Sequence, residues 1–288
     1  MTTTLFDAAS LTRLWTGAIW TEGPLWIPDA GRVRFSDIPN HRIIDVDPES
    51  GGARIVTDHS EYTNARTFTP SGELLECSHG RRRVERVVDQ STYQTEAVIA
   101  AYRGRRLNSP NDIIADSRGL IWFTDPAYGI DADTREGYPG EQEYGGCFVF
   151  RCDLASGQLD AVITTMVRPN GLAFSPDESR LYVSDTGHAP GAEAHGEILV
   201  FDLEDGEPVG GTRFAKVDEG ASDGIKVDAS GRVWSSAGDG VYVFSPEGAL
   251  IEKLPLPERV SNLCFGGADG RDLFITATSS LYAVRVNV

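Results

Sequence analysis

The sequence predicts an all-β protein, a six-bladed β-propeller whose four-stranded blades surround a central channel. Three observations support this prediction. A short pattern recurs six times along the chain, each copy combines an alternating stretch, a turn and a β-rich apolar run, and no 15-residue stretch has helical periodicity over its whole length. The period of roughly 40 to 60 residues suits a blade, whereas a solenoid would repeat at a shorter or helical period.

Each copy of the pattern opens on a residue with a side-chain oxygen, which we call its lead residue. A turn follows eight or nine residues later, usually at Gly, and leads into a short apolar run. Because the blades of a propeller are arranged radially, one repeat position of every blade lies beside the axis, and we expect the lead side chains to converge there. In order, the lead residues are Glu22, Asn64, Asn111, Asn170, Asp223 and Asn262, and the turns with their runs span 31–35, 72–75, 119–123, 179–183, 231–234 and 270–275.

Residues 1–288 are expected to form one propeller domain, because no Pro/Ser-rich linker or charge run divides them. The ring must also close. We expect a strand near Leu11 to Trp15 to pair into the blade that holds Ser280 to Val286, since an unpaired strand would leave an exposed edge.

The composition limits the classes of partner. A net charge of −17 argues against nucleic acid and against an anionic membrane surface as binding partners. The first 20 residues lack the pattern of a signal peptide, and nothing approaches 18 consecutive apolar residues. The four cysteines form no CxxC pair and are expected to be reduced thiols. The sequence therefore predicts a cytoplasmic protein, and it leaves the oligomeric state open.

The chemistry of the lead residues favours a cation site. Carboxylate and amide oxygens are the ligands that calcium prefers, and two ionised lead residues would balance one divalent charge. The alternative is a ring of solvated polar side chains around a wet channel. The repeat alone leaves both interpretations open.

Six longer motifs, in order along nearly the whole chain, give the sequence a family resemblance. They resemble the gluconolactonase family, which includes the senescence marker protein regucalcin and the bacterial sugar lactonases, and this chain is most similar to the bacterial branch. The resemblance implies one divalent metal at the channel mouth, with Glu22, Asn170 and Asp223 as its ligands and Asn111 contacting either metal or substrate. The motifs span 21–24, 77–84, 109–113, 122–126, 168–177 and 222–228.

The resemblance also implies an activity, the metal-dependent hydrolysis of a small sugar lactone such as a gluconolactone. The ion, calcium first with magnesium, manganese or zinc as alternatives, would polarise the lactone carbonyl as a Lewis acid and lower the pKa of a bound water. Asp223 is the first choice of general base and His79 the second. Two alternatives stay open: another hydrolase on the same metal, phosphotriesterase-like or acting on non-sugar lactones, and a non-enzymatic propeller that binds metal or a partner.

The candidate substrate-binding residues are Asn111, Asn64, Tyr128, His188 and Arg66. Asn64 occupies a lead position, and we expect it to contact substrate directly or through water. Tyr128 and His188 follow apolar runs in longer loops, where they could contact a sugar.

Arg66 has two interpretations. The bacterial lactonase branch usually has Asn-Gly-Asn-Thr where this chain has Asn64-Ala65-Arg66-Thr67. Strand alternation would place Arg66 on the same side as Asn64, where its guanidinium could bind a sugar hydroxyl or a substrate carboxylate. The alternative is an ion pair with Glu61 or Glu76.

Several other polar residues are expected to be structural. Asp37, Asp125 and Asp185 follow the apolar runs of the first, third and fourth repeats, a position typical of strand-end residues. Asp112 is expected to orient Asn111 or to cap a turn.

Overall fold

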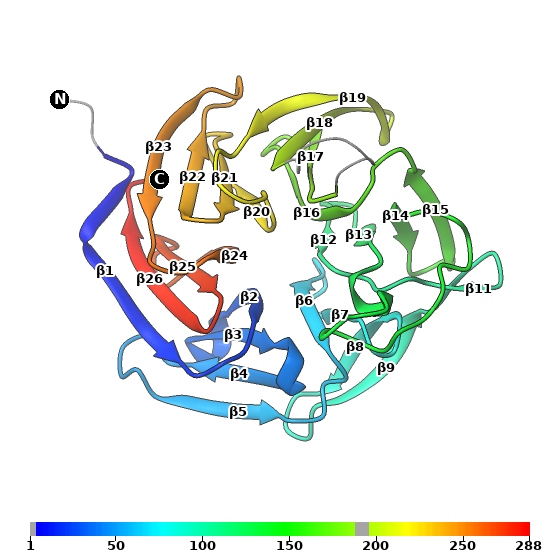
Figure 1. Cartoon of the computed structure of the whole chain (residues 1–288), viewed down its shortest axis with the longest axis horizontal. Helices are drawn as coiled ribbons and strands as arrows, with labels where there is room; N and C mark the ends of the chain where they lie inside the picture. Colours follow the sequence, from blue (N-terminus) through cyan, green and yellow to red (C-terminus); the bar gives the residue numbers. More distant parts are fainter. Residues whose placement is uncertain (1–3, 188–195) are drawn as a thin grey trace.

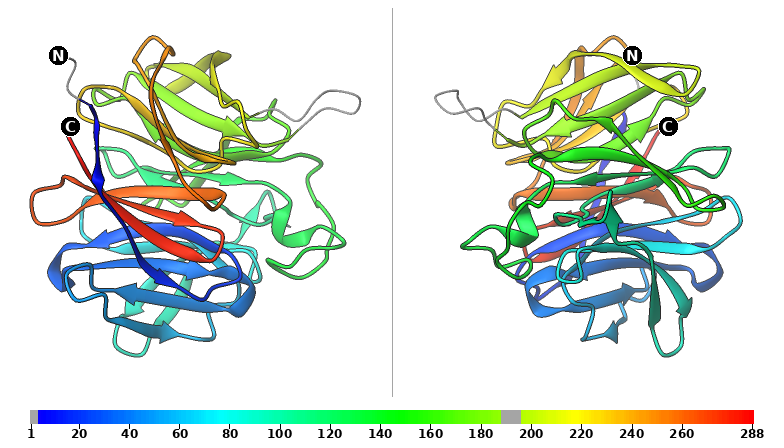
Figure 2. Two further views of the ribbon diagram at one scale, coloured as in Figure 1. Left: turned by 60° about the vertical axis from the view of Figure 1, so that its left-hand side comes forward. Right: turned by 90° about the vertical axis from the view of Figure 1, so that its right-hand side faces the viewer.

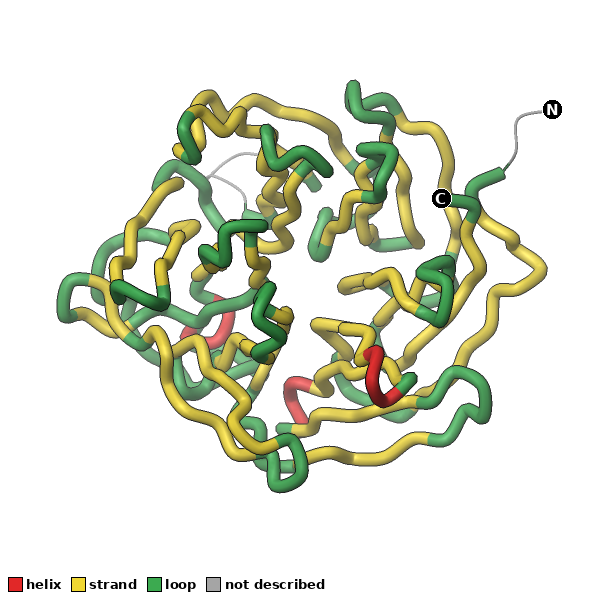
Figure 3. The backbone as a smooth tube through the Cα atoms, turned by 180° about the vertical axis from the view of Figure 1, so that it is seen from behind, coloured by secondary structure: helices red, strands yellow, loops and turns green. Residues whose placement is uncertain are grey.

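The computed structural model, which describes residues 4–187 and 196–288, confirms the predicted propeller. Six four-stranded antiparallel sheets surround a common centre (Figure 1). The other elements of the described residues are the hairpin β10 (Ala101–Tyr102) and β11 (Arg105–Arg106) and three short 3-10 turns, drawn in red in Figure 3: η1 (Pro28–Ala30), η2 (Ile38–Asn40) and η3 (Tyr128–Ile130).

In five blades the strands pair in chain order from the innermost to the outermost, and in the sixth the first strand of the chain is added outside the last three. The first three blades are β2 (Thr21–Ile27), β3 (Arg32–Asp37), β4 (Arg42–Val46) and β5 (Ala53–Thr57); β6 (Thr63–Phe68), β7 (Leu74–Ser78), β8 (Arg83–Asp89) and β9 (Gln94–Ile99); and β12 (Ile113–Ala115), β13 (Ile121–Asp125), β14 (Phe148–Asp153) and β15 (Gln158–Ile163). The last three are β16 (Pro169–Phe174), β17 (Arg180–Asp185), β18 (Glu197–Glu204) and β19 (Glu207–Lys216); β20 (Ile225–Val227), β21 (Val233–Ala237), β22 (Gly240–Phe244) and β23 (Leu250–Pro255); and β24 (Val260–Gly266), β25 (Asp272–Ala277), β26 (Ser280–Val286) and β1 (Phe6–Thr16).

The turn between the first two strands of a blade lies where the repeat predicts it. Five of the six turns have a glycine with a positive φ, for example Gly72 at 85° and Gly119 at 87°. Glycine adopts this conformation without the steric cost of a β-carbon. The fourth turn uses Glu178 at a φ of 53° in the same region of backbone space.

The ring closes as predicted, because β1 pairs antiparallel with β26 and becomes the outermost strand of the sixth blade. Arg13 lies opposite Tyr282 and Trp15 opposite Leu281. β1 and β26, from opposite ends of the sequence, therefore lie side by side in Figure 1. This pairing also buries Phe6, whose ring meets Trp234 of the fifth blade edge-on at 5.2 Å.

The hydrophobic core lies between neighbouring blades, which pack face to face (Figure 2). One cluster joins Trp122 and Val149 of the third blade to Leu172 and Leu181 of the fourth. Because the apolar side chains are used between the sheets, polar side chains are left to line the axis. No helix within 4–187 and 196–288 is long and apolar enough to cross a membrane.

Candidate active site and metal centre

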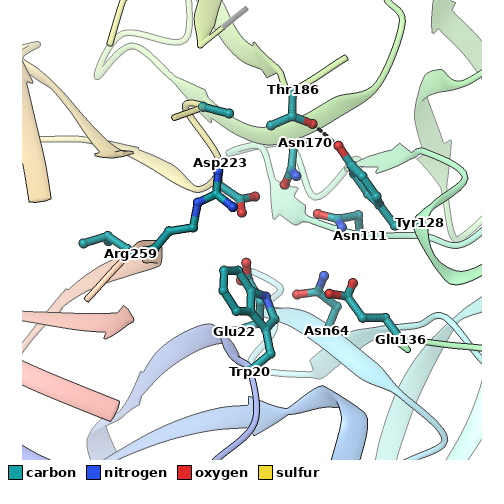
Figure 4. Close-up of a pocket in the computed structure, with 12 residues that line it drawn as sticks. Trp20, Glu22, Asn64, Asn111, Tyr128, Glu136, Asn170, Thr186, Asp223 and Arg259 are labelled. Carbon is teal, nitrogen blue, oxygen red and sulfur yellow. Dashed lines mark hydrogen bonds between the residues drawn. The ribbon is translucent and has the colours of Figure 1, made fainter. Parts of the chain in front are cut away.

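The lead residues meet at one end of the channel, around a cavity of about 240 Å³ (Figure 4). Five of the six line it: Glu22, Asn64, Asn111, Asn170 and Asp223. The sixth, Asn262, lines a second chamber formed by the next residues of the same innermost strands. The amide nitrogen of Asn262 donates a hydrogen bond of 3.1 Å to Oε2 of Glu22, so it supports the cavity from behind.

Irregular strand pairing turns the lead side chains toward the axis. A β-bulge places an extra residue in one strand, interrupts the alternation and re-aims the neighbouring side chains. In the third and fifth blades the innermost strand starts two residues after the lead residue. In the other four blades the ladder shifts register beside it, between Glu22 and Leu25, Thr63 and Arg66, Pro169 and Leu172, and Val260 and Asn262.

The three strand-end aspartates anchor the loops that carry the site, which confirms their structural role. Asp37 accepts a backbone hydrogen bond of 3.0 Å from Ile19, just before Glu22. Asp125 accepts one of 2.8 Å from Asn108, just before Asn111. Asp185 likewise accepts 2.9 Å and 2.8 Å bonds from the two residues that precede β16, the strand of Asn170. Each lead residue of these blades is therefore held by the end of the next strand.

Close packing of the innermost strands explains the glycine that follows several lead residues. The Gly171 nitrogen donates a hydrogen bond of 3.0 Å to the Asp223 carbonyl oxygen of the next blade. A β-carbon at Gly171 would collide with that oxygen, and one at Gly224 would collide with the side chain of Asn262. Only glycine allows the blades to approach so closely around the site.

The cavity concentrates negative charge. Burial, followed by the charge of Asp223, raises the pKa of Glu22 well above its usual value. Burial, followed by the charge of Glu136, also raises the pKa of Asp223, while the charge of Arg259 lowers it. Both shifts have the same physical cause, because carboxylates close together in a poorly hydrated site resist ionisation. A divalent cation between them would remove the repulsion.

The donor set fits a hard cation. Oε2 of Glu22 accepts a 2.8 Å bond from the Gly23 nitrogen as well as the bond from Asn262, and no hydrogen bond within the described ranges uses its Oε1. Oδ1 of Asn64 is buried without a hydrogen-bond partner. The described residues contain no cluster of three or more His, Cys, Asp or Glu side chains suited to a metal. An ion here would therefore rely on amide as well as carboxylate oxygens, a set that suits calcium.

The structure places His79 behind the cavity, a position that favours a structural role over its prediction as a general base. The side chain is fully buried between two partners: Nδ1 lies 3.0 Å from the Glu136 carbonyl oxygen, and Nε2 lies 3.3 Å from the amide nitrogen of Asn64. If Nδ1 carries the proton, Nε2 accepts a hydrogen bond from the amide nitrogen of Asn64. The Oδ1 of Asn64, which has no hydrogen-bond partner, can then face the cavity. Burial lowers the pKa of His79 to about 4, so the ring is neutral near pH 7. His79 positions Asn64 and the loop of Glu136 and does not itself reach the cavity.

Arg66 forms the predicted ion pair and does not line the active-site cavity, which favours the ion pair over the substrate-binding role. Nε of Arg66 lies 2.8 Å from Oε1 of Glu76, and both side chains are fully buried. The other two guanidinium nitrogens donate to the carbonyl oxygen of Gly23 and to the hydroxyl of Ser36. The register shift between Thr63 and Arg66 breaks the alternation that would have put Arg66 beside Asn64.

Tyr128 lines the cavity as expected, at the start of η3. Its hydroxyl hydrogen bonds to the hydroxyl of Thr186, and the guanidinium carbon of Arg168 lies 4.9 Å from its ring centre. Arg168 is itself held by Asp131 at 2.7 Å. The ring is therefore fixed at the rim. His188, the remaining candidate for substrate binding, lies outside the described residues.

Besides the small apolar residues Ala221 and Val260, the cavity is lined by four side chains that were not predicted from the sequence: Trp20, Glu136, Thr186 and Arg259. In Figure 4, Arg259 and Asp223 lie on one side of the cavity and Glu136 and Asn64 on the other. Burial raises the pKa of Glu136 to about 7. These residues belong to loops outside the repeat, so no periodic signal marked them. The one available hint was the proximity of Trp20 to Glu22 in the sequence.

Comparison with known proteins places this geometry in a family. Residues 20–279 match the family model described as the SMP-30/Gluconolactonase/LRE-like region. A gluconolactonase of Zymomonas mobilis is 34% identical over 290 residues, which cover 92% of this chain and 78% of that protein. The pentonolactonase XacC of Haloferax volcanii is 30% identical over 264 residues, with 88% and 80% covered. The solved structure of a gluconolactonase from Xanthomonas campestris superposes with a TM-score of 0.88 at 36% identity, over 96% of this chain and 89% of that one.

Proposed function

The chain belongs to the SMP-30/gluconolactonase/LRE-like family, and from this premise we propose that it hydrolyses a small sugar lactone with the help of one divalent ion. Membership makes it a lactonase, and its relatives include a gluconolactonase and a pentonolactonase. The metal dependence and the roles of single residues are our proposals. The observation that supports them is the cavity in which five lead side chains present carboxyl and amide groups to one point.

We assign the ion to Glu22, Asn170 and Asp223, with Asn111 completing the set, and calcium is the first choice because all the donors are oxygens. When bound, the ion would supply Lewis-acid polarisation of the lactone carbonyl and of a water molecule. The residues themselves fit this role, since the two carboxylates repel each other and the Asn170 amide hydrogen bonds to Asp223.

In this proposal the side chains of the cavity transfer the proton and bind the hydroxyl groups of the sugar. A water oxygen attacks the carbonyl carbon while Asp223 takes its proton, and the proton then passes to the ring oxygen when the carbon–oxygen bond breaks. His79 cannot take this role from behind Asn64, and Glu136 is the other acid that faces the cavity. Asn111, Asn64 and Tyr128 supply hydrogen bonds for the hydroxyl groups of the sugar.

We also propose that the protein works in a reducing compartment such as the cytoplasm. All four cysteines are free and buried, at positions 77, 147, 152 and 264. Unpaired thiols are the usual state of cysteine in that compartment.

The test combines activity with metal content. Five- and six-membered aldonolactones are offered to the protein before and after removal of divalent ions with a chelator, and elemental analysis counts the ions. We expect hydrolysis that the chelator abolishes and calcium restores, and about one ion per chain. Asp223→Asn should lose both the ion and the turnover.

The matched control is Asp202→Asn, which makes the same change at an exposed position of β18, where Asp202 forms a surface pair with Arg180 at 3.5 Å. It should keep ion and activity. Full metal content in Asp223→Asn would remove Asp223 from the ligand set, and chelator-resistant hydrolysis would refute the metal dependence.

A further inference from the structure

A second chamber of about 280 Å³ continues the channel beyond the active-site cavity. It is formed by the residues that follow the lead positions on the innermost strands, and most of its lining is apolar. Its charged side chains are Asp112, Lys226 and Arg66. Arg66 is already matched by the buried Glu76. This leaves one carboxylate and one ammonium group facing each other within the ring.

Asp112 and Lys226 come from the third and the fifth blade. The Lys226 Nζ lies 3.8 Å from Oδ2 of Asp112 and 2.9 Å from the carbonyl oxygen of Ile225. The Asp112 side chain is almost completely buried. Its Oδ1 accepts a 2.8 Å bond from the Ile113 nitrogen, and its Oδ2 has no hydrogen-bond partner in the described part of the chain. The ammonium of Lys226 is therefore the cation that faces this oxygen.

The Asp112 carboxylate also acts on the active-site cavity. Asp112 directly follows Asn111, a proposed ligand whose side chain lines the cavity, so its carboxylate lies beside the ion site. In agreement with this position, its charge contributes to the raised pKa of Glu22 and of Asp223.

When all three carboxylates are ionised, as a bound divalent ion would favour, they carry three negative charges and Lys226 supplies one positive charge. The sum is two negative charges, which one divalent ion would neutralise. At the rim, Arg259 adds one positive charge, and Glu136 balances it when it is ionised.

We propose that Lys226 is a fixed counter-cation which, through Asp112, sets the affinity of the lead-residue site for its divalent ion. The inference rests on the proposed function, because it assumes that the ion binds at Glu22, Asn170 and Asp223. Lys226 is a positioning residue in this scheme and does not touch the ion. Its ammonium repels a cation at the neighbouring site and lowers the attraction that Asp112 would otherwise add.

Removing the ammonium should tighten ion binding. A unit charge several ångströms from a divalent ion, in surroundings with a high effective dielectric constant, changes the affinity for that ion by roughly tenfold. Lys226→Met keeps much of the side-chain length and removes the charge, so calcium should bind on the order of tenfold more tightly. Lys226→Arg keeps the charge and should bind calcium like the parent.

The experiment is a calorimetric titration of the metal-free protein with calcium, so the readout does not depend on turnover. The matched control is Lys216→Met, which removes the same charge from the exposed outer strand β19 and should leave calcium affinity unchanged. Thermal unfolding of the metal-free variants checks that they fold. If Lys226→Met does not fold, Lys226→Gln removes the same charge, and its calcium affinity is compared with that of the parent and of Lys216→Met.

The outcomes separate this inference from the proposed function. If the parent binds no divalent ion, the proposed metal site fails. If the parent binds one ion and Lys226→Met binds it with the same affinity as the parent, the metal site stands and the role of Lys226 is refuted. Equal tightening in Lys226→Met and Lys216→Met would also refute it, because the effect would then come from net charge alone.

Discussion

At the scale of single residues, His79 shows how burial converts a titratable group into a structural one. The ring is enclosed between Asn64 and the loop of Glu136, and burial lowers its pKa to about 4 from an ordinary value near 6.5. The folded state therefore binds fewer protons than the unfolded state between these two values. The stability contributed by neutral His79 is complete above pH 6.5 and is lost as the pH falls toward 4.

The loss of stability with falling pH leads to a prediction that can be measured. The free energy of unfolding of the parent should fall between pH 6.5 and 4 with a contribution of up to about 1.4 kcal/mol per pH unit from His79. His79→Asn should remove that part of the slope, whatever its effect on the absolute stability. Denaturant titrations at several pH values of metal-free protein give the measurement. His59→Asn, which changes a largely exposed imidazole, is the control, and a slope shared by parent and His79→Asn would contradict the assignment.

Arg66 leads to a prediction about stability and not about specificity. Arg66→Met leaves Glu76 charged and buried without its partner, which typically costs about 3–5 kcal/mol of unfolding free energy. The ranking of lactone substrates should stay the same. Arg86→Met is the control, because Arg86 pairs with Glu73 and Glu96 at the surface and such pairs contribute about 0–1 kcal/mol. A variant that unfolds like the parent but prefers different lactones would restore the substrate role of Arg66.

His79 and Arg66 also show which parts of a site can be predicted from sequence. Lead residues such as Glu22 and Asp223 were identifiable because the same backbone position recurs in every blade. Arg66 was placed on the wrong side because alternation was extended through a bulge that the sequence does not mark. His79 was assigned a chemical role because the sequence does not show whether a histidine beside a cavity is buried or faces it.

At the scale of elements, the innermost strands and the closing strand have different tasks. The innermost strands carry the site, and their irregular pairing with the second strand aims the lead side chains. The closing strand β1 carries no lead residue, yet it covers the edge of β26 and buries Phe6 against the neighbouring blade.

Deletion of residues 1–16 should therefore damage solubility rather than chemistry. The exposed edge of β26 would offer unpaired backbone groups to other chains, and we expect oligomers or aggregates together with a lower melting temperature. Light scattering and thermal unfolding measure both effects. A chain that lacks only residues 1–3, which precede β1, is the control. A monomer with unchanged melting after deletion of residues 1–16 would show that β1 is not needed for closure.

At the scale of the whole molecule, the fold was more predictable than the content of its channel. The propeller follows from six copies of one local pattern, because each copy determines a sheet that must pack against its neighbours. The loops at the mouth differ from blade to blade, and Glu136 lies in the long connection between β13 and β14. The pairing of Asp112 with Lys226 joins separate blades, so neither local pattern nor sequence spacing could indicate it.

The way the ring closes also constrains how the protein is made. The closing contacts join Thr16 to Ser280, which follows it by 264 residues. At synthesis rates of roughly 5–20 residues per second, the ribosome needs roughly 10 to 50 s to travel from one strand to the other. Throughout this interval β1 has no strand to pair with, whereas each of the first five blades has all four of its strands as soon as its own last strand is made. Closure of this ring therefore requires β1 to dock onto a strand that is synthesised much later.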